Sequence, residues 1–225
     1  AHDMGDLFPP PVLRLALLGK DINQQIDVDP SGDSVPRMYD WYDELAENVR
    51  GGGEDDFARL FKLCQLEQSK DTPWQMRFGQ VAFIVQMPHL NLLQEAEQVK
   101  GSVLTTNEKS ALEERASYAK FWLTTYAPDA YKYTLQETYT PITLSDAQKR
   151  ALASLHVFMN EALRTGEELH LKLHELKTEV PIQPKELFSA LYQIFLGRDS
   201  GPKAGWFLSV LPHDFVLQRL LDAST

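Results

Sequence analysis

The stretch Leu187–Phe207, LFSALYQIFLGRDSGPKAGWF, decides the fold class of this chain. Apolar residues recur at helical spacing on two faces of its first half, which is typical of a helix that is buried on both sides. Gly197 follows them and is predicted to take the left-handed conformation that ends many helices. A charged elbow, residues 198–203, leads to a second helix that we expect to begin near Ala204. The stretch therefore predicts two helices joined by a short turn.

The elbow carries two cations, Arg198 and Lys203, on either side of an Asp-Ser-Gly-Pro turn. Proline is tolerated at a first helical position, and a helix start presents backbone N–H groups that suit an anion such as phosphate. An ordinary helical corner with surface charges explains the same residues. The elbow alone leaves both interpretations open.

This stretch and the C-terminus resemble the C-terminal region of class I lysyl-tRNA synthetase. The matching residues are Leu191-Tyr192, Leu196-Gly197-Arg198, Gly201-Pro202-Lys203, Gly205-Trp206-Phe207, Phe215-Val216 and Arg219-Leu220. The stretch is more distantly similar to the end of glutamyl-tRNA synthetase, whose last helices form an anticodon-binding cage. The segments 201–207 and 122–128 favour the lysine enzyme.

The resemblance implies that the elbow faces the anticodon loop of lysine tRNA. The residues that it assigns to tRNA binding are Arg198, Ser200, Gly201, Pro202, Lys203, Gly205, Trp206 and Phe207. Lys203 and Arg198 would meet phosphates or base edges, and Trp206 would stack on a base or support the elbow. A purely structural role for Trp206 in the core is the alternative.

A second match lies near the N-terminus, over residues 8–43. Its features are Pro10-Pro11-Val12-Leu13-Arg14, Asn23, Ile26-Asp27-Val28-Asp29-Pro30, Arg37, Asp40 and Tyr42-Asp43. In the class I lysine enzyme the similar segment links the nucleotide-binding fold to the anticodon cage. The resemblance therefore implies a connector or stem-contact segment in residues 1–70 and a helical anticodon-binding domain in residues 71–225.

The composition is that of a globular chain. Its 225 residues are 43% apolar and 24% charged, which is ordinary for such proteins. No apolar run is long enough to span a membrane, and the first residues do not follow the pattern of a signal peptide. The single cysteine, Cys64, excludes an internal disulfide and is expected to be a core residue in a reducing compartment. We therefore expect a cytoplasmic protein with no membrane partner.

The net charge of −10 argues against nucleic acid, but its distribution weakens that objection. Residues 1–56 contain 13 acidic and 4 basic side chains, whereas residues 57–225 contain 19 and 18. The larger part is therefore nearly neutral. We expect RNA affinity that depends partly on stacking and shape, and no DNA partner.

Helical patterns cover most of the chain. Capping boxes are predicted at Thr72, Thr105 and Ser145, each with Glu or Gln three residues later. The helix after Ser145 is expected to bury Leu163 and to end at Gly166. The predicted core of the bundle includes Leu112, Leu123, Leu152, Leu155, Leu191, Ile194 and Leu220. The fold class is mainly all-α, a helical bundle or cage with a short extended connector near residues 24–30.

Two groups of residues permit a metal site. Asp27 and Asp29 would point the same way on an extended segment, but turn and cap roles on a connector explain them better. His170 and His174 lie one helical turn apart, but no third ligand is placed, and a solvated helix face explains them. We therefore assign no metal ligand and no catalytic residue.

Two motifs of class I synthetases, HIGH and KMSKS, are absent from the sequence. The parent enzyme uses ATP and Mg, so we expect no cofactor in this chain and no ligase activity by it alone. Ala1 is expected just past the second motif, and an excised fragment and a stand-alone relative both fit. The predicted function is tRNA binding for aminoacylation by an upstream catalytic domain. The alternative is an all-helical protein-interaction module that docks through its acidic N-terminal quarter.

Overall fold

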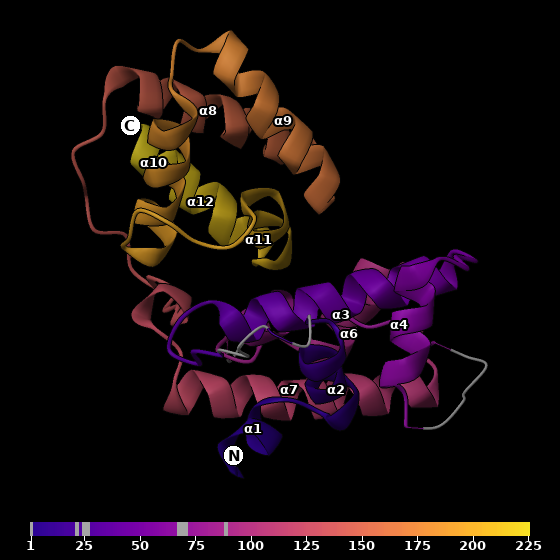
Figure 1. Ribbon diagram of the computed structural model, residues 1–225. Coiled ribbons are helices and arrows are strands. Elements are labelled where there is room, and N and C mark those ends of the chain that lie inside the picture. Colours follow the sequence, from indigo (N-terminus) through magenta and orange to yellow (C-terminus); the bar gives the residue numbers. More distant parts are fainter. Residues whose placement is uncertain (1, 21–22, 24–27, 67–71, 88–89) are drawn as a thin grey trace. The chain divides into compact units, whose positions relative to one another are not determined.

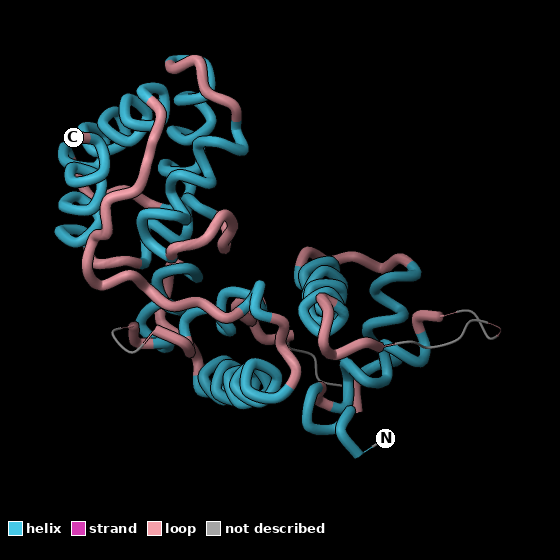
Figure 2. Tube along the Cα trace, turned by 90° about the vertical axis from the view of Figure 1, so that its left-hand side faces the viewer, coloured by secondary structure: helices cyan, strands magenta, loops and turns pink. Residues whose placement is uncertain are grey.

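The computed structural model describes residues 2–20, 23, 28–66, 72–87 and 90–225. Within these ranges the chain forms twelve α-helices and one 3-10 turn. It has no strand there, as Figure 2 shows. The predicted all-α class is thus confirmed. The extended connector predicted near residues 24–30 falls mostly outside the described residues. The chain divides into two compact units, Ala1–Lys132 and Tyr133–Thr225 (Figure 1).

Unit 1 is built around aromatic residues of three helices. Tyr39 stacks on Phe78 at 4.1 Å between ring centroids, and Phe78 meets Trp122 at 5.7 Å. Trp122 is fully buried, and its indole N–H donates to the carbonyl of Pro30 at 2.8 Å. The helices of the unit are α1 (His2–Leu7), α2 (Pro10–Leu18), α3 (Ser34–Arg50), α4 (Asp56–Cys64), α5 (Phe78–Ile84), α6 (Leu92–Lys100) and α7 (Thr106–Thr125), followed by the turn Asp129–Tyr131.

The structural units differ from the segments 1–70 and 71–225. The predicted boundary at residues 70/71 falls between α3 and α5, but Tyr39 of α3 stacks on Phe78 of α5. The buried aromatic contact therefore holds both helices in one unit. Arg115 on α7 also forms a buried ion pair with Asp43 on α3, at 2.8 Å. The segments 1–70 and 71–225 stay a prediction about function.

Two of the three predicted capping boxes are present, at Thr105 and Ser145. In the first box, Glu108 accepts from the backbone N–H of Thr105 at 2.8 Å and from Lys100 Nζ at 2.6 Å. Burial alone would raise the pKa of Glu108, but these hydrogen bonds outweigh it and lower the pKa to about 2. Glu108 therefore remains ionised down to low pH and holds the start of α7.

The predicted capping box at Thr72 is wrong. Residues 72–77 are not helical, and α5 begins only at Phe78. The carbonyl of Met76 accepts a hydrogen bond from Arg115 at 2.8 Å, and Arg77 pairs with Glu47 at 3.0 Å. These long-range contacts hold the segment extended, whereas the local pattern favoured a helix.

Unit 2 is a bundle of five helices. They are α8 (Asp146–Glu161), α9 (Gly166–Glu179), α10 (Pro184–Leu196), α11 (Ala204–Val210) and α12 (His213–Ser224). Helix α12 packs against α8, and α11 packs against α9. The predicted core is confirmed in both units, since Leu112, Leu123, Leu152, Leu155, Leu191, Ile194 and Leu220 are each at most 8% exposed.

The junction of α8 and α9 differs from the prediction. Helix α8 ends at Glu161, and Leu163 is 79% exposed and not buried. Gly166 opens α9 after a capping box at Thr165, so it does not close α8. The reason is local, because Thr165 and Glu168 cap each other and start α9 here. In addition, a Cβ at Gly166 would lie 3.1 Å from the Cα of Trp206. The absence of a side chain allows α11 to approach the first turn of α9.

Candidate functional site

The elbow takes most of its predicted form. Helix α10 ends at Leu196, Gly197 has φ of +64°, and α11 begins at Ala204. Pro202 differs, because it lies two residues before α11 and not at its first position. The Tyr192 hydroxyl donates to the carbonyl of Pro202 and holds it against α10.

Two further contacts fold the elbow back onto α10. Asp199 accepts hydrogen bonds from Ser189 at 2.7 Å and Gln193 at 2.9 Å, which lower its pKa. A Cβ at Gly201 would lie 2.6 Å from ring atoms of Tyr192. Only glycine at position 201 therefore allows the backbone to lie this close to the ring of Tyr192. The elbow is a packed turn with a defined conformation.

The extended segment after residue 132 lies beside the elbow. The backbone N–H of Gln136 donates to the carbonyl of Phe195 at 2.8 Å. Arg219 on α12 is 3% exposed and donates to the carbonyls of Ile194, Gln136 and Glu137. Its guanidinium thus satisfies the carbonyl of Ile194, one of the last carbonyls of α10, which have no partner within the helix. Arg219 fixes the segment to the end of α10.

Tyr133 completes this surface of unit 2. The guanidinium carbon of Arg198 lies 5.5 Å from the centre of the Tyr133 ring, within the range of a cation–π contact. Burial, with a smaller contribution from Tyr133, raises the pKa of Tyr192 to about 12. Tyr133 is not among the site residues predicted from the sequence. The aromatic repeat YKYTLQETY at residues 131–139 is the signal that marks it.

The eight predicted site residues fall into two sets. Ser200 and Lys203 are exposed, and the half-buried residues are Arg198, Gly201, Pro202 and Trp206. Gly205 and Phe207 are buried. Phe207 packs edge-on against Phe195 at 5.8 Å, and a Cβ at Gly205 would lie 2.4 Å from the carbonyl oxygen of Gly166. These two residues pack inside unit 2 and support the elbow, whereas the other six lie at or near the surface.

The remaining candidate groups do not come together. Asp27 lies outside the described residues, and Asp29 accepts from the backbone N–H and the hydroxyl of Ser31, as a turn cap does. His170 and His174 are exposed on α9 with ring centroids 4.5 Å apart. Among the described residues, no cluster of three or more His, Cys, Asp or Glu side chains is arranged to hold a metal ion. Cys64 is fully buried, as predicted.

No family model matches this chain. Curated proteins do match it over almost its whole length. Lysine–tRNA ligase of Methanosarcina barkeri is 30% identical over 99% of the chain, and the enzyme of Thermoplasma volcanium is 26% identical over 98%. The chain resembles the C-terminal region of lysine–tRNA ligases. The resemblance predicted from the elbow is therefore confirmed.

The match covers only part of these relatives. The chain spans 45% of the length of the Methanosarcina barkeri enzyme and 44% of the Thermococcus kodakarensis enzyme, to which it is 28% identical. None of the helices in the described ranges has the length and apolar character needed to cross a bilayer.

Proposed function

We propose that this chain is the tRNA-binding region of a class I lysyl-tRNA synthetase and recognises the anticodon stem-loop of lysine tRNA in the cytoplasm. The observation that carries this proposal is the similarity to lysine–tRNA ligases over 97–99% of the chain. Aminoacylation itself would come from a catalytic domain, with its ATP and Mg, outside these residues. The elbow supplies surface groups suited to a single-stranded RNA loop.

Charge and planar groups favour unit 2 as the RNA-binding part. It contains 11 acidic and 9 basic side chains, whereas unit 1 contains 21 and 13. Unpaired bases are bound by aromatic and arginine planes and by contacts to their edges. Arg198 lies over the ring of Tyr133, so the pair provides one plane of each kind, and exposed Lys203 provides a charge for a phosphate. Trp206, half-buried in the first turn of α11, is proposed to support or stack on the same loop.

The test is binding of lysine tRNA to the 225-residue chain at several salt concentrations. A contact between Lys203 and a phosphate contributes about one unit to the slope of log affinity against log salt, so Lys203→Ala should lower the slope by about one. Lys62→Ala removes the charge of another exposed lysine, on α4 of unit 1, and serves as the control. Equal slopes for the two variants would contradict the phosphate contact.

Stacking is tested at Tyr133 and Trp206. A stacked base contributes roughly 1–3 kcal/mol by alanine substitution, so Tyr133→Ala or Trp206→Ala should weaken binding about tenfold. Affinity is measured at a temperature at which each variant is fully folded. This separates a stacking residue from a core residue, whose truncation acts only through unfolding.

The second candidate function is protein interaction without RNA binding. The acidic excess of unit 1 favours it, because such a surface repels a phosphate backbone. Footprinting of lysine tRNA separates the candidates. Protection of the anticodon loop supports the first, and the absence of any protection supports the second. If the chain is the tRNA-binding region, it should form no lysyl-adenylate by itself. Lysine-dependent exchange of pyrophosphate into ATP measures this reaction.

A further inference from the structure

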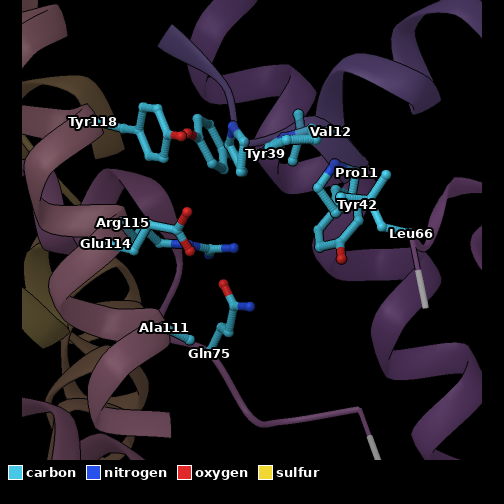
Figure 3. A pocket seen from close by; sticks show the side chains of 12 residues that line it. Pro11, Val12, Tyr39, Tyr42, Leu66, Gln75, Ala111, Glu114, Arg115 and Tyr118 are labelled. Atoms are coloured by element: carbon cyan, nitrogen blue, oxygen red, sulfur yellow. The ribbon is translucent and has the colours of Figure 1, made fainter. Parts of the chain in front are cut away.

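Unit 1 contains a cavity of about 240 Å³ that the proposed tRNA site does not use. Figure 3 shows that one face of α7 borders it with Ala111, Glu114 and Tyr118. Tyr42 and Leu66 lie on the opposite side, and Gln75 lies near the same face of α7. The volume is below the roughly 300–1,000 Å³ of pockets for drug-sized ligands. The cavity therefore suits a single side chain or a small group.

The cavity has a negative rather than a positive character. Arg115 also borders it, but both terminal nitrogens of its guanidinium bind the Asp43 carboxylate at 2.8 Å, which neutralises its charge. Glu114 is exposed, and the described residues form no salt bridge with it. Besides burial, the carboxylates of Glu114 and Asp6 raise the pKa of Tyr118. The negative charges of Glu114 and Asp6 are thus felt at Tyr118, which borders the cavity.

The start of α2 does not offset this character. Helix starts attract anions through free N–H groups, but Pro9–Pro11 at this border of the cavity have none. Unit 1 as a whole contains 21 acidic and 13 basic side chains. A phosphate or carboxylate is therefore disfavoured here, and a cation is favoured.

We propose that this cavity binds the lysine or arginine side chain of a basic segment in a partner protein. A cation is attracted to the face of an aromatic ring and to a carboxylate, and Tyr118 and Glu114 present both on adjacent turns of α7. The acidic surface of unit 1 complements the rest of a basic segment. This inference is independent of the elbow, which lies in unit 2.

The test uses the full chain and the peptide acetyl-Gly-Arg-Gly-amide, with the citrulline analogue as its neutral counterpart. Binding is followed by NMR shifts of the amides of Ala111 and Tyr118. We expect the arginine peptide to bind and the citrulline peptide to bind at least tenfold more weakly. A short uridine oligonucleotide is added in a separate titration, and binding of RNA at these amides would overturn the proposal.

Two matched variants locate the charge. Glu114→Gln should weaken binding of the arginine peptide about three- to tenfold, the range expected for a partly exposed charged hydrogen bond. Glu113→Gln removes a charge from the preceding residue, which is also exposed but does not border the cavity, and should have little effect. Equal weakening in both variants, equal binding of the citrulline peptide, or no binding of the arginine peptide would each overturn the proposal.

Discussion

The buried ion pair between Asp43 and Arg115 permits a quantitative prediction about unit 1. Asp43 is 4% exposed and Arg115 is 3% exposed, and two hydrogen bonds of 2.8 Å join them. Removal of one partner leaves the other charge buried without compensation, which costs about 3–5 kcal/mol. Since a domain of this kind is stable by only about 5–15 kcal/mol, Asp43→Leu alone should remove a large part of the free energy of unfolding.

The double variant Asp43→Leu with Arg115→Met should be much less destabilised than either single variant. Apolar replacement of a whole buried ion pair is often close to neutral. The structure adds one cost, because the carbonyl of Met76 loses the hydrogen bond from Arg115, and an unsatisfied buried acceptor costs about 1–3 kcal/mol. We therefore expect the double variant to lose about 1–3 kcal/mol.

The assay is urea unfolding followed by tryptophan fluorescence. Three of the four tryptophans, Trp41, Trp74 and Trp122, belong to unit 1, so the signal reports mainly on that unit. The free energy of unfolding is obtained for the parent chain, both single variants and the double variant. Losses that simply add in the double variant would refute the reasoning, because they would show that neither charge depends on the other.

The remaining predictions concern packing and pH. Gly205→Ala should destabilise unit 2 by about 1–3 kcal/mol, because its Cβ would lie 2.4 Å from a carbonyl oxygen of α9. Gly79→Ala, with no atom within 4 Å of its Cβ, should stabilise α5 or be neutral, which thermal unfolding will show. Leu155→Ala should cost about 2–5 kcal/mol in urea, whereas the exposed Leu163→Ala should cost less than about 0.5 kcal/mol. Because the pKa of Glu108 is lowered in the folded state to about 2, its stabilisation is present above the ordinary value of 4.5 and is lost as pH falls toward 2. Glu108→Gln should flatten the loss of stability over that interval in acid-unfolding curves, and an unchanged curve would contradict the shift.

The amino-acid sequence determined those features that depend on local spacing and backbone chemistry. Apolar periodicity placed Leu152, Leu155 and Leu191 in the core, because residues three or four apart share one face of a helix. Gly197 was predicted in the left-handed region, since glycine has no Cβ to oppose that conformation. The elbow motif also carried the resemblance to lysine–tRNA ligases, which the comparison confirmed.

Tertiary structure decided the features that depend on partners far away in the chain. The helix expected from Thr72 begins only at Phe78, since Arg115 and Glu47 bind the two residues before it. The absence of a side chain at Gly166 lets α11 approach the start of α9, since a Cβ there would lie 3.1 Å from the Cα of Trp206. Tyr133 joins the elbow because Arg219, more than eighty residues away, holds the adjoining segment at the end of α10. Local propensities differ by less than about 1 kcal/mol per residue for most amino acids, so buried charged hydrogen bonds and steric exclusion override them.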